Sequence, residues 1–467
     1  MVNASLAGGI PDGAPPTARA TRVRYWVLAA GCSLALLTYA HRLGFAVYAP
    51  EIKRDFDLTD QGVAYLMTAF LVTYGICQVP AGLAGDRLGA RLVLPLLVVG
   101  WSLVTAAIAL LPGVAQTAVR PRAFLLEPLV LLLILRALFG ASQSGAFPVF
   151  TRVLADWMPL TERASAQGAI WTASRLGGAL LPFVLAWLPR VFGGWRVPLE
   201  ILSGLGLLWG AAFWCWFRNR PEDEGRVNAA ERTLIRAGQT AAADRPAAVP
   251  WRRILGSRNV WFLCLMYGSC GPAGNFIFTL LPVYLRDHRH LPPDTVAWLL
   301  GLPLAVGFVA CSLGGVVSDW LIRRGVSRKW GRRVNGLAGL ALAGLAFAAM
   351  AWVEDGWLLG LVLCATQFGN DFCMGPAWAA CADIGEGSAG TISGAMNMTS
   401  NIAGGAGAAL AGYLFVRGHA GWVFVAFGAL WMAGALCWLG IDVTKPLATP
   451  TGVSSRPGLD ENRQRGT

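Results

Sequence analysis

Long apolar stretches alternate with short polar breaks along most of the chain. Each stretch holds about 20 residues or more, the length that an α-helix needs to cross the hydrocarbon core of a bilayer. The pattern predicts six such helices in the first half of the chain and six in the second. The expected ranges are 24–48, 62–83, 92–112, 125–157, 167–189 and 197–217, then 259–285, 295–322, 334–353, 357–383, 390–416 and 421–441. The fourth and tenth are long enough to predict tilted or protruding helices.

Polar segments divide the chain into five parts. Residues 219–257 are too charged to enter hydrocarbon, so they are expected to form a cytoplasmic loop that links a first bundle at 22–218 to a second at 258–442. The ends, 1–21 and 443–467, are rich in Gly, Pro, Ser and Thr, which predicts disordered tails. The first tail lacks the apolar core of a cleaved signal peptide. We therefore expect an all-α membrane protein with twelve transmembrane helices in two six-helix bundles.

The distribution of Lys and Arg predicts the orientation of these helices. Outside the predicted spans, most basic residues fall on one face, in the two tails, in the 219–257 loop and in 323–333. The positive-inside rule then puts both termini and the central loop in the cytoplasm of a multi-pass protein of the inner membrane. This bias also accounts for the formal net charge of +12 without a nucleic-acid partner. With 55% hydrophobic and only 14% charged residues, a soluble globule is excluded.

Residue types that commonly carry catalysis or bind metals form no recognisable set. The ten cysteines include no CxxC pair, so they predict apolar packing and no disulfide framework. His288 and His290 lie in a predicted outer loop without further metal-ligand spacing, which favours a solvated surface. No convergent nucleophile and base appear either. We expect no enzymatic activity, no metal and no cofactor.

An internal repeat relates the two halves. Gly82 and Asp86 close the second span, and Gly315 and Asp319 close the eighth with the same spacing. Because the offset is about half the chain, the repeat predicts two pseudo-symmetric bundles with a binding site at the membrane midplane between them.

A second repeat matches the fifth span to the eleventh. It aligns Trp171 with Asn397 and Arg175 with Asn401, and residues four apart share one helical face. All four side chains are therefore expected to face a central cavity. The two amides are suited to the hydroxyl groups of a sugar acid, and they are equally suited to hydrogen bonds between helices.

Three arginines inside predicted spans indicate an anionic cargo. Arg42, Arg136 and Arg175 lie in spans one, four and five, with few acidic residues in the same half. A charge at the bilayer centre costs about 3 kcal/mol or more, so such a residue usually faces a cavity or a partner. A guanidinium group can hold a carboxylate by two parallel hydrogen bonds. The alternative for each is bonding to backbone carbonyls or tying helices together.

These motifs resemble those of a known family. The whole chain resembles the major facilitator superfamily, whose signature loop is similar to the stretch with Gly82, Asp86, Arg87, Gly89 and Arg91. A further set resembles the anion:cation symporter group, which carries sugar acids, hexuronates, phthalate and, in animal vesicles, organic anions. That set is Arg42, Tyr74, the 78–82 segment, Arg136 with Pro148, the 157–163 segment and the eleventh span.

The resemblance implies roles for individual residues. It implies that Arg42 binds a carboxylate with help from Tyr74, that the Asp86 loop latches a cytoplasmic gate, and that the protein is a monomer. Proton symport is the family default, but the two positions that usually carry acids are His41 and Gln143 here. A His41 relay, another ion or uncoupled movement remain open. Asp371 is a further candidate for coupling, although a structural role is favoured for it, as for Asn275 and Asn370.

The leading hypothesis is uptake of a small organic anion, such as a sugar acid or aromatic carboxylate, by alternating access across the bilayer. Efflux of a drug or metabolite is an alternative, but span five lacks the GxxxGPxxGG-like antiporter pattern. A transport-like sensor is a second alternative, for which the 219–257 loop is too short to form a signalling domain.

Overall fold

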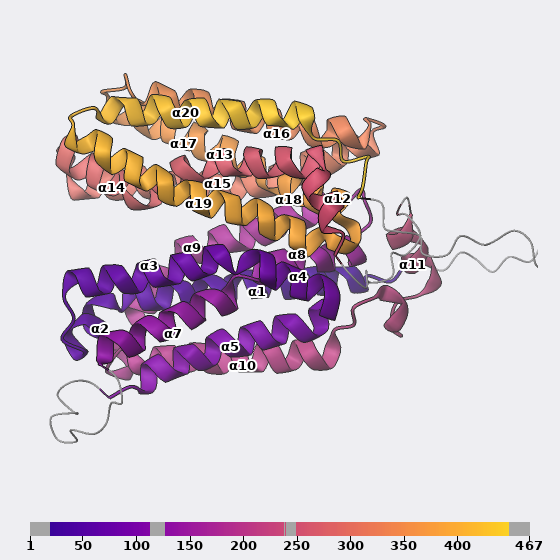
Figure 1. The fold of residues 1–467 in the computed structure, drawn as a ribbon, viewed down its shortest axis with the longest axis horizontal. Coiled ribbons are helices and arrows are strands. Elements are labelled where there is room, and N and C mark those ends of the chain that lie inside the picture. Colours follow the sequence, from indigo (N-terminus) through magenta and orange to yellow (C-terminus); the bar gives the residue numbers. More distant parts are fainter. Residues whose placement is uncertain (1–18, 113–126, 238, 240–248, 448–467) are drawn as a thin grey trace, which may run out of the picture.

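The computed structural model describes residues 19–112, 127–237, 239 and 249–447. Its long helices run nearly parallel and form two bundles, which lie one above the other in Figure 1. Most of the predicted tails lies outside the described residues. The first bundle contains α1 (Val23–Val47), α2 (Ala49–Asp55), α3 (Asp60–Ile76), α4 (Gln78–Leu88), α5 (Ala90–Leu110), α7 (Pro128–Gln143), α8 (Ala146–Trp157), α9 (Arg163–Phe192) and α10 (Arg196–Trp216).

The second bundle has the same plan. It contains α13 (Arg258–Thr279), α14 (Leu281–Val283), a π-helical turn η2 (Tyr284–His288), α15 (Pro293–Arg323), α16 (Arg328–Ala349), α17 (Gly356–Phe372), α18 (Met374–Gly385), η3 (Glu386–Ser388), α19 (Ala389–Val416), α20 (Ala420–Cys437) and η4 (Trp438–Gly440). With the pairs α3/α4, α7/α8 and α17/α18 taken as single columns, the described residues form six membrane-length columns in each bundle.

Hydropathy alone identifies only part of this set. Among the described residues, seven helices are long and apolar enough to cross a membrane, and the bent pair α3/α4 makes an eighth. The four columns that fall short are α13, α16, α17/α18 and α19. These columns carry polar or small residues where they pack against one another or border the central cavity, as Asn397 and Asn401 do on α19. A helix that is partly shielded from lipid does not have to be apolar on every face.

Three predicted continuous spans are interrupted. The spans predicted at 62–83, 125–157 and 357–383 break at Cys77, at Ser144–Gly145 and at Cys373, and α3 and α4 meet at 44°. In each case a proline is the third residue of the following helix: Pro80, Pro148 and Pro376. Proline has no N–H and clashes with the carbonyl four residues earlier, which disrupts the helix at that point. The long fourth and tenth spans are therefore broken helices.

The loop between the bundles contains a short helix, α11 (Ala229–Arg236), and η1 (Pro221–Asp223) precedes it. Glu231 is fully buried and accepts a 3.0 Å hydrogen bond from Arg24 at the start of α1, and Arg24 also pairs with Glu162. A hydrogen bond from Arg236 is the main cause that holds the pKa of Glu222 below its ordinary value. The polar loop thus packs on the first bundle, and α12 (Trp251–Gly256) follows it in the chain.

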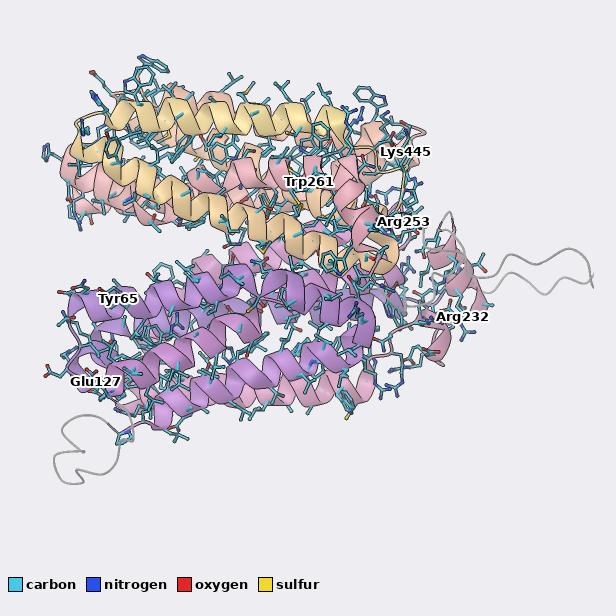
Figure 2. The ribbon with its side chains drawn as sticks, viewed as in Figure 1. Tyr65, Glu127, Arg232, Arg253, Trp261 and Lys445 are labelled. Carbon is cyan, nitrogen blue, oxygen red and sulfur yellow. The ribbon has the colours of Figure 1, made fainter. Side chains whose placement is uncertain are left out.

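Small residues bring the two bundles together at one end. A Cβ atom added to Gly82 of α4 would lie 2.2 Å from the carbonyl oxygen of Gly390 on α19. A Cβ added to Gly315 of α15 would lie 2.3 Å from the carbonyl oxygen of Ala164 on α9. This end is the one that carries α11, Arg232 and Lys445, whereas Tyr65 and Glu127 lie at the opposite end (Figure 2). Backbone contact without side chains is what glycine permits.

Candidate functional site

A cavity of about 580 Å³ lies between the two bundles. It is open to the surroundings, because the lining side chains of Leu71, Phe278 and Ile402 are 51%, 57% and 60% exposed. Among the described residues, hydrogen bonds between the bundles occur at the cavity or between it and the end with Gly82 and Gly390. The cavity is therefore closed toward that end. Its polar and aromatic lining includes Tyr39, Arg42, Tyr74, Phe147, Trp171, Arg175, Tyr267, Asn275, Asn370, Asn397, Ser400 and Asn401.

Arg42 of α1 presents an uncompensated positive charge to this cavity. Its Nε atom donates a 3.0 Å hydrogen bond to Gln143, and among the described residues it has no carboxylate partner. One terminal nitrogen is buried without a hydrogen-bond partner. Because a buried unpaired charge is costly, this geometry is suited to an incoming anion.

Aromatic rings surround the guanidinium group of Arg42. Its central carbon lies 4.7 Å from the ring centroid of Tyr74, 5.3 Å from that of Phe70 and 5.5 Å from that of Tyr39. These cation–π contacts stabilise the charge without consuming its hydrogen-bond donors. Elsewhere in the lining, Trp171 stacks on Phe147 with ring centroids 5.0 Å apart. The indole N–H of Trp171 is buried and has no hydrogen-bond partner among the described residues. Within the part of the chain that the structure describes, the site thus combines a cation that has no carboxylate partner with aromatic faces.

Arg175 is not the unneutralised cation that the sequence suggested. It lines the cavity, but its Nε and one terminal nitrogen donate to the carboxylate of Asp371 at 2.8 and 2.5 Å. Asp371 lies on α17 of the other bundle and is fully buried. The expectation of few acidic partners considered only acids in the same half of the chain, and the neutralising acid comes from 196 residues away.

Arg136 is likewise placed differently from the expectation. It is buried outside the cavity lining, and its guanidinium carbon lies 4.0, 4.9 and 5.1 Å from the rings of Phe45, Phe70 and Phe139. Among the described residues, its polar contacts are a 3.5 Å hydrogen bond to the carbonyl of Leu66 and a 4.0 Å contact with the sulfur of Met67. In this conformation Arg136 cannot touch a molecule in the cavity.

The positions that replace the usual acids have different surroundings. Gln143 is fully buried, donates to the Thr38 carbonyl at 3.0 Å and accepts from Arg42, so it fixes the orientation of that arginine. His41 is buried outside the cavity lining and contacts Trp101 edge-on, with one ring nitrogen 3.0 Å from the Leu37 carbonyl. A proton relay through His41 would have no direct path to the cavity in this structure.

The predicted pair of amides lies on the cavity wall as the repeat suggested. Asn397 and Asn401 line the cavity on α19, and Trp171 and Arg175 line it on α9. The Asn401 amide donates 2.8 Å to the backbone oxygen of Asn397, which leaves its side-chain oxygen for another donor. Asn275 donates to the backbone oxygen of Gly404, so it holds α13 to α19.

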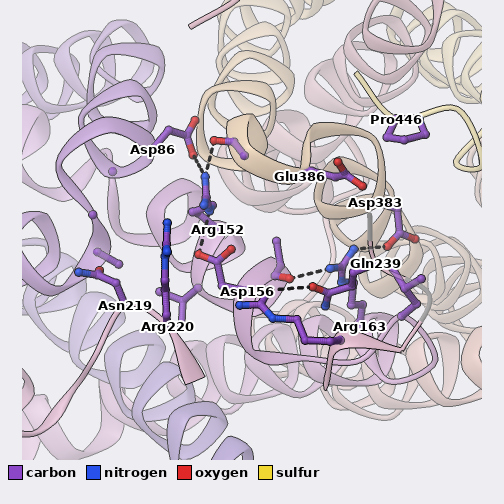
Figure 3. A pocket seen from close by; sticks show the side chains of 18 of the residues that line it. Asp86, Arg152, Asp156, Arg163, Asn219, Arg220, Gln239, Asp383, Glu386 and Pro446 are labelled. Atoms are coloured by element: carbon purple, nitrogen blue, oxygen red, sulfur yellow. Dashed lines mark hydrogen bonds and ion pairs between the residues drawn. The ribbon is translucent and has the colours of Figure 1, made fainter. Parts of the chain in front are cut away.

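The signature loop joins the two bundles at the end toward which the cavity is closed. Asp86 is buried and accepts hydrogen bonds from the N–H groups of Gly390 and Thr391 at 3.0 and 2.7 Å, and from the Thr391 hydroxyl at 2.7 Å. These donors start α19, where the helix dipole favours a carboxylate. Arg152 lies 3.9 Å from Asp86 (Figure 3) and also donates to the Gly387 carbonyl.

The second bundle repeats this arrangement. Asp319 accepts from the N–H groups of Ala164 and Ser165 at 3.4 and 2.6 Å, at the start of α9. Arg332 donates 2.6 Å to Asp319 and reaches the Leu160 carbonyl across the interface. Asp383 pairs with Arg163 at 2.9 Å across the same interface (Figure 3). The end is thus closed by two carboxylates on opposite helix N-termini, surrounded by ion pairs.

The remaining signature residues shape the loop. Gly89 ends α4 at φ +86°, a conformation that favours glycine. The Nε atom of Arg91 donates to the Trp214 carbonyl, and the backbone N–H of Arg91 donates to the side-chain oxygen of Asn219, which anchors α5 to the end of α10. Arg87 is exposed. We call Asp86, Arg152, Arg163, Asp319, Arg332 and Asp383 the gate residues, and a smaller cavity of about 150 Å³ is lined in part by Asp86, Arg152, Arg163 and Asp383.

Sequence reasoning missed several of these side chains. Tyr39 lies three residues before Arg42, on the same face of α1, so helical spacing could have identified it. Arg332 falls in the basic segment 323–333, which was expected to lie outside the spans, although its side chain is fully buried beside Asp319 and Asp383. No local signal distinguishes Asp383 from other acids, because its partners come from distant helices.

Comparisons with known proteins agree with this architecture. The family model described as Major Facilitator Superfamily matches residues 31–408. The chain is 30% identical over 440 residues to the probable sulfoacetate transporter SauU of Cupriavidus necator, covering 94% of this chain and 97% of that protein. It is 26% identical to the probable galactarate/D-glucarate transporter GudP of Escherichia coli, over 82% and 85% of the two chains.

Solved structures show the same fold. The human organic anion transporter MFSD10 superimposes with a TM-score of 0.65 at 18% identity, covering 90% of this chain and all of that one. The proton:xylose symporter XylE gives a TM-score of 0.66 at 13% identity, covering 90% and 98%. At these identities the likeness concerns the fold alone.

Proposed function

The chain belongs to the Major Facilitator Superfamily and is a multi-pass membrane transporter, not an enzyme, and from this we propose that it carries a small organic anion by alternating access. Arg42 binds the carboxylate or sulfonate of the cargo. The observation that supports this role is a guanidinium group that lines the central cavity, has no acidic partner among the described residues and keeps a terminal nitrogen free.

The surroundings of Arg42 fit an oxyacid with a polar or aromatic body. Gln143 holds the Arg42 Nε atom, so neither terminal nitrogen of this cavity-lining side chain is used in that bond. Tyr74 and Trp171 offer a hydroxyl and an indole N–H, and Asn397 and Asn401 of the other bundle offer amides. Charge-assisted bonds of this kind contribute about 1.5 to 3 kcal/mol each. The relatives' names give the first cargoes to test: sulfoacetate, D-glucarate and D-galactonate.

The direction and location of transport form part of the proposal. The bacterial relatives and the excess of basic residues at the end with Arg232 and Lys445 support an inner-membrane protein with that end in the cytoplasm. The Asp86 and Asp319 gate then closes the cytoplasmic side, and the cavity opens outward. An outward-facing cavity with a free cation is the state that receives an anion for uptake. Asp86 and Asp319 act as latches that break when the cytoplasmic side opens.

Uptake by purified protein in liposomes tests this proposal. Radiolabelled sulfoacetate, D-glucarate and D-galactonate are supplied outside, and Arg42→Gln is compared with wild type. We expect the variant to lose uptake and to lose the anion-dependent rise in melting temperature, while its melting temperature without anion stays near the wild-type value. Arg190→Gln, at the exposed outer end of α9, is the matched control.

Two further variants separate charge from geometry. Arg42→Lys keeps the charge but not the planar pair of donors, so it should retain only part of the affinity. Gln143→Leu removes the bond that orients Arg42 and should weaken binding about tenfold or more. Uptake at the wild-type rate by Arg42→Gln would overturn the role of Arg42. Failure of the wild-type protein to move any of the three anions would count against the proposed cargo class.

A further inference from the structure

A second charged site spans the two bundles beside the Arg42 pocket. The Arg175 side chain is one-tenth exposed and lines the cavity, whereas Asp371 lies behind it and is fully buried. Of the buried acidic side chains in the described residues, Asp86, Asp319 and Asp383 belong to the gate, and Glu224 and Glu231 belong to the central loop. Asp371 is the remaining one and the only one at the depth of the cavity.

The surroundings of Asp371 are built to hold a carboxylate. Besides the two bonds from Arg175, it accepts hydrogen bonds from Gln367 at 2.7 Å and from Asn370 at 3.0 Å. A Cβ atom on Gly307 would lie 2.2 Å from its Oδ2, so α15 leaves space for this oxygen. Gln367 donates to Oδ2 and Asn370 donates to Oδ1, so whichever oxygen of a protonated Asp371 remains the carbonyl oxygen keeps an amide donor.

We propose that the Arg175–Asp371 pair is the proton-binding site that couples anion uptake to a proton gradient, an inference that rests on the anion transport proposed above. A proton from the outer solution binds an Asp371 oxygen, and the Arg175 guanidinium transfers its hydrogen bonds to the bound anion. After the gate opens, the anion and the proton leave into the cytoplasm, and Asp371 regains Arg175. One proton thus moves with each carboxylate that occupies Arg175.

The physical reason is the cost of leaving a buried charge alone. Arg42 and Arg175 both line the cavity, and Tyr39 lies close to both guanidinium groups, so one anion can reach the two cations. If the anion takes Arg175 while Asp371 stays ionised, a fully buried carboxylate loses its cation. An uncompensated buried charge is strongly destabilising, and protonation removes it.

The pair also spans the moving interface. Arg175 belongs to α9 and Asp371 to α17, so rocking of one bundle against the other changes their separation. One turn closer to the gate, Thr172 and Ser312 form a 2.7 Å hydrogen bond across the same interface. Binding of a proton at Asp371 therefore weakens a contact that resists opening of the gate.

Among the described residues, no second buried carboxylate lies at this depth to take up the proton. The α16 face against α17 is formed by Gly339 and Ala343. The titratable groups that face the pair from the packed helices are phenols and thiols, which are uncharged near neutral pH. They are Tyr39 of α1, Tyr267 of α13, Cys311 of α15 and Cys373 after α17.

The test measures protons and anions separately in the full chain. With an inward-directed gradient of about one pH unit, wild-type proteoliposomes should accumulate D-galactonate about tenfold, because one proton accompanies one carboxylate. Asp371→Asn should show no accumulation beyond equilibrium but should retain exchange of labelled for unlabelled anion. Asp294→Asn removes an exposed acid at the start of α15 and is the matched control.

A binding measurement makes the test independent of transport. In weakly buffered detergent solution with a pH-indicator dye, addition of D-galactonate should cause proton uptake by wild type and by Asp294→Asn, and none by Asp371→Asn. If Asp371→Asn does not fold, the double variant Arg175→Gln with Asp371→Asn removes both charges and should also take up no proton. Gradient-driven accumulation by either Asp371 variant would overturn the inference.

The two proposals fail in different ways. Wild-type protein that exchanges anions but binds them without proton uptake refutes the proton site and leaves the anion carrier intact. Wild-type protein that neither binds nor exchanges any of the anions refutes the anion carrier itself.

Discussion

Replacing Gly82 by alanine should prevent the gate from closing fully. The added Cβ would lie 2.2 Å from the Gly390 carbonyl oxygen, which is 1.2 Å short of the 3.4 Å at which ordinary contact begins. Parting α4 and α19 by that amount would lengthen the 2.7 Å bond from the Thr391 N–H to Asp86 to 3.9 Å, beyond hydrogen-bond range. The same change would destabilise the closed gate through steric overlap and through the lost bond.

These two effects set the expected magnitude. Overpacking costs about 1 to 3 kcal/mol, and the loss of one charge-assisted bond adds about 1.5 to 3 kcal/mol. Together they shift the equilibrium between closed and open gate by roughly 100-fold or more toward the open state. The substituted residue itself favours helix, since alanine is about 1 kcal/mol better than glycine there. Any loss of gate closure therefore comes from the contact with α19.

Hydrogen exchange measured by mass spectrometry reads this equilibrium directly. The N–H groups of Gly390 and Thr391 are protected by Asp86 only while the gate is closed, so peptides covering 386–396 should exchange faster in Gly82→Ala. Gly204→Ala is the matched control, because no atom lies within 4 Å of an added Cβ there and the residue is exposed on α10. Unchanged exchange in these peptides, with a preserved melting temperature, would refute the steric account.

Two other substitutions test assignments made from the structure. Arg136→Met should raise the melting temperature or leave it unchanged. Replacing a buried unpaired charge by an apolar side chain of similar size is often neutral or stabilising by about 1 to 4 kcal/mol. A loss of anion affinity as large as that of Arg42→Gln would contradict the placement of Arg136 outside the cavity. Glu231→Gln removes the carboxylate that binds Arg24 and should cost about 1 to 3 kcal/mol. Trypsin should then cleave within α11 at least about fivefold faster, and an unchanged cleavage rate would argue against this contact as the anchor of the loop.

The apolar pattern of the sequence was sufficient for the main architecture. Because a residue in hydrocarbon must be apolar or face a partner, the apolar stretches predict the spans, although α13, α16, α17/α18 and α19 are less apolar than a span that faces lipid on all sides. The repeat that pairs Gly82 with Gly315 and Asp86 with Asp319 also lies in the sequence, and the structure places both aspartates at helix N-termini of the opposite bundle. The prolines Pro80, Pro148 and Pro376 are also present in the sequence, and their helix-breaking chemistry would have predicted the interruptions that precede them.

Charge compensation was decided only by the tertiary structure. The sequence presents Arg42, Arg136 and Arg175 as three similar cations in spans. The fold leaves Arg42 open to the cavity, encloses Arg136 among aromatic rings and neutralises Arg175 with Asp371 of the other bundle. Hydropathy is a property of neighbouring residues along the chain, and it can be read locally. The state of a buried charge depends on atoms within a few ångströms, and these come from helices that only folding brings together.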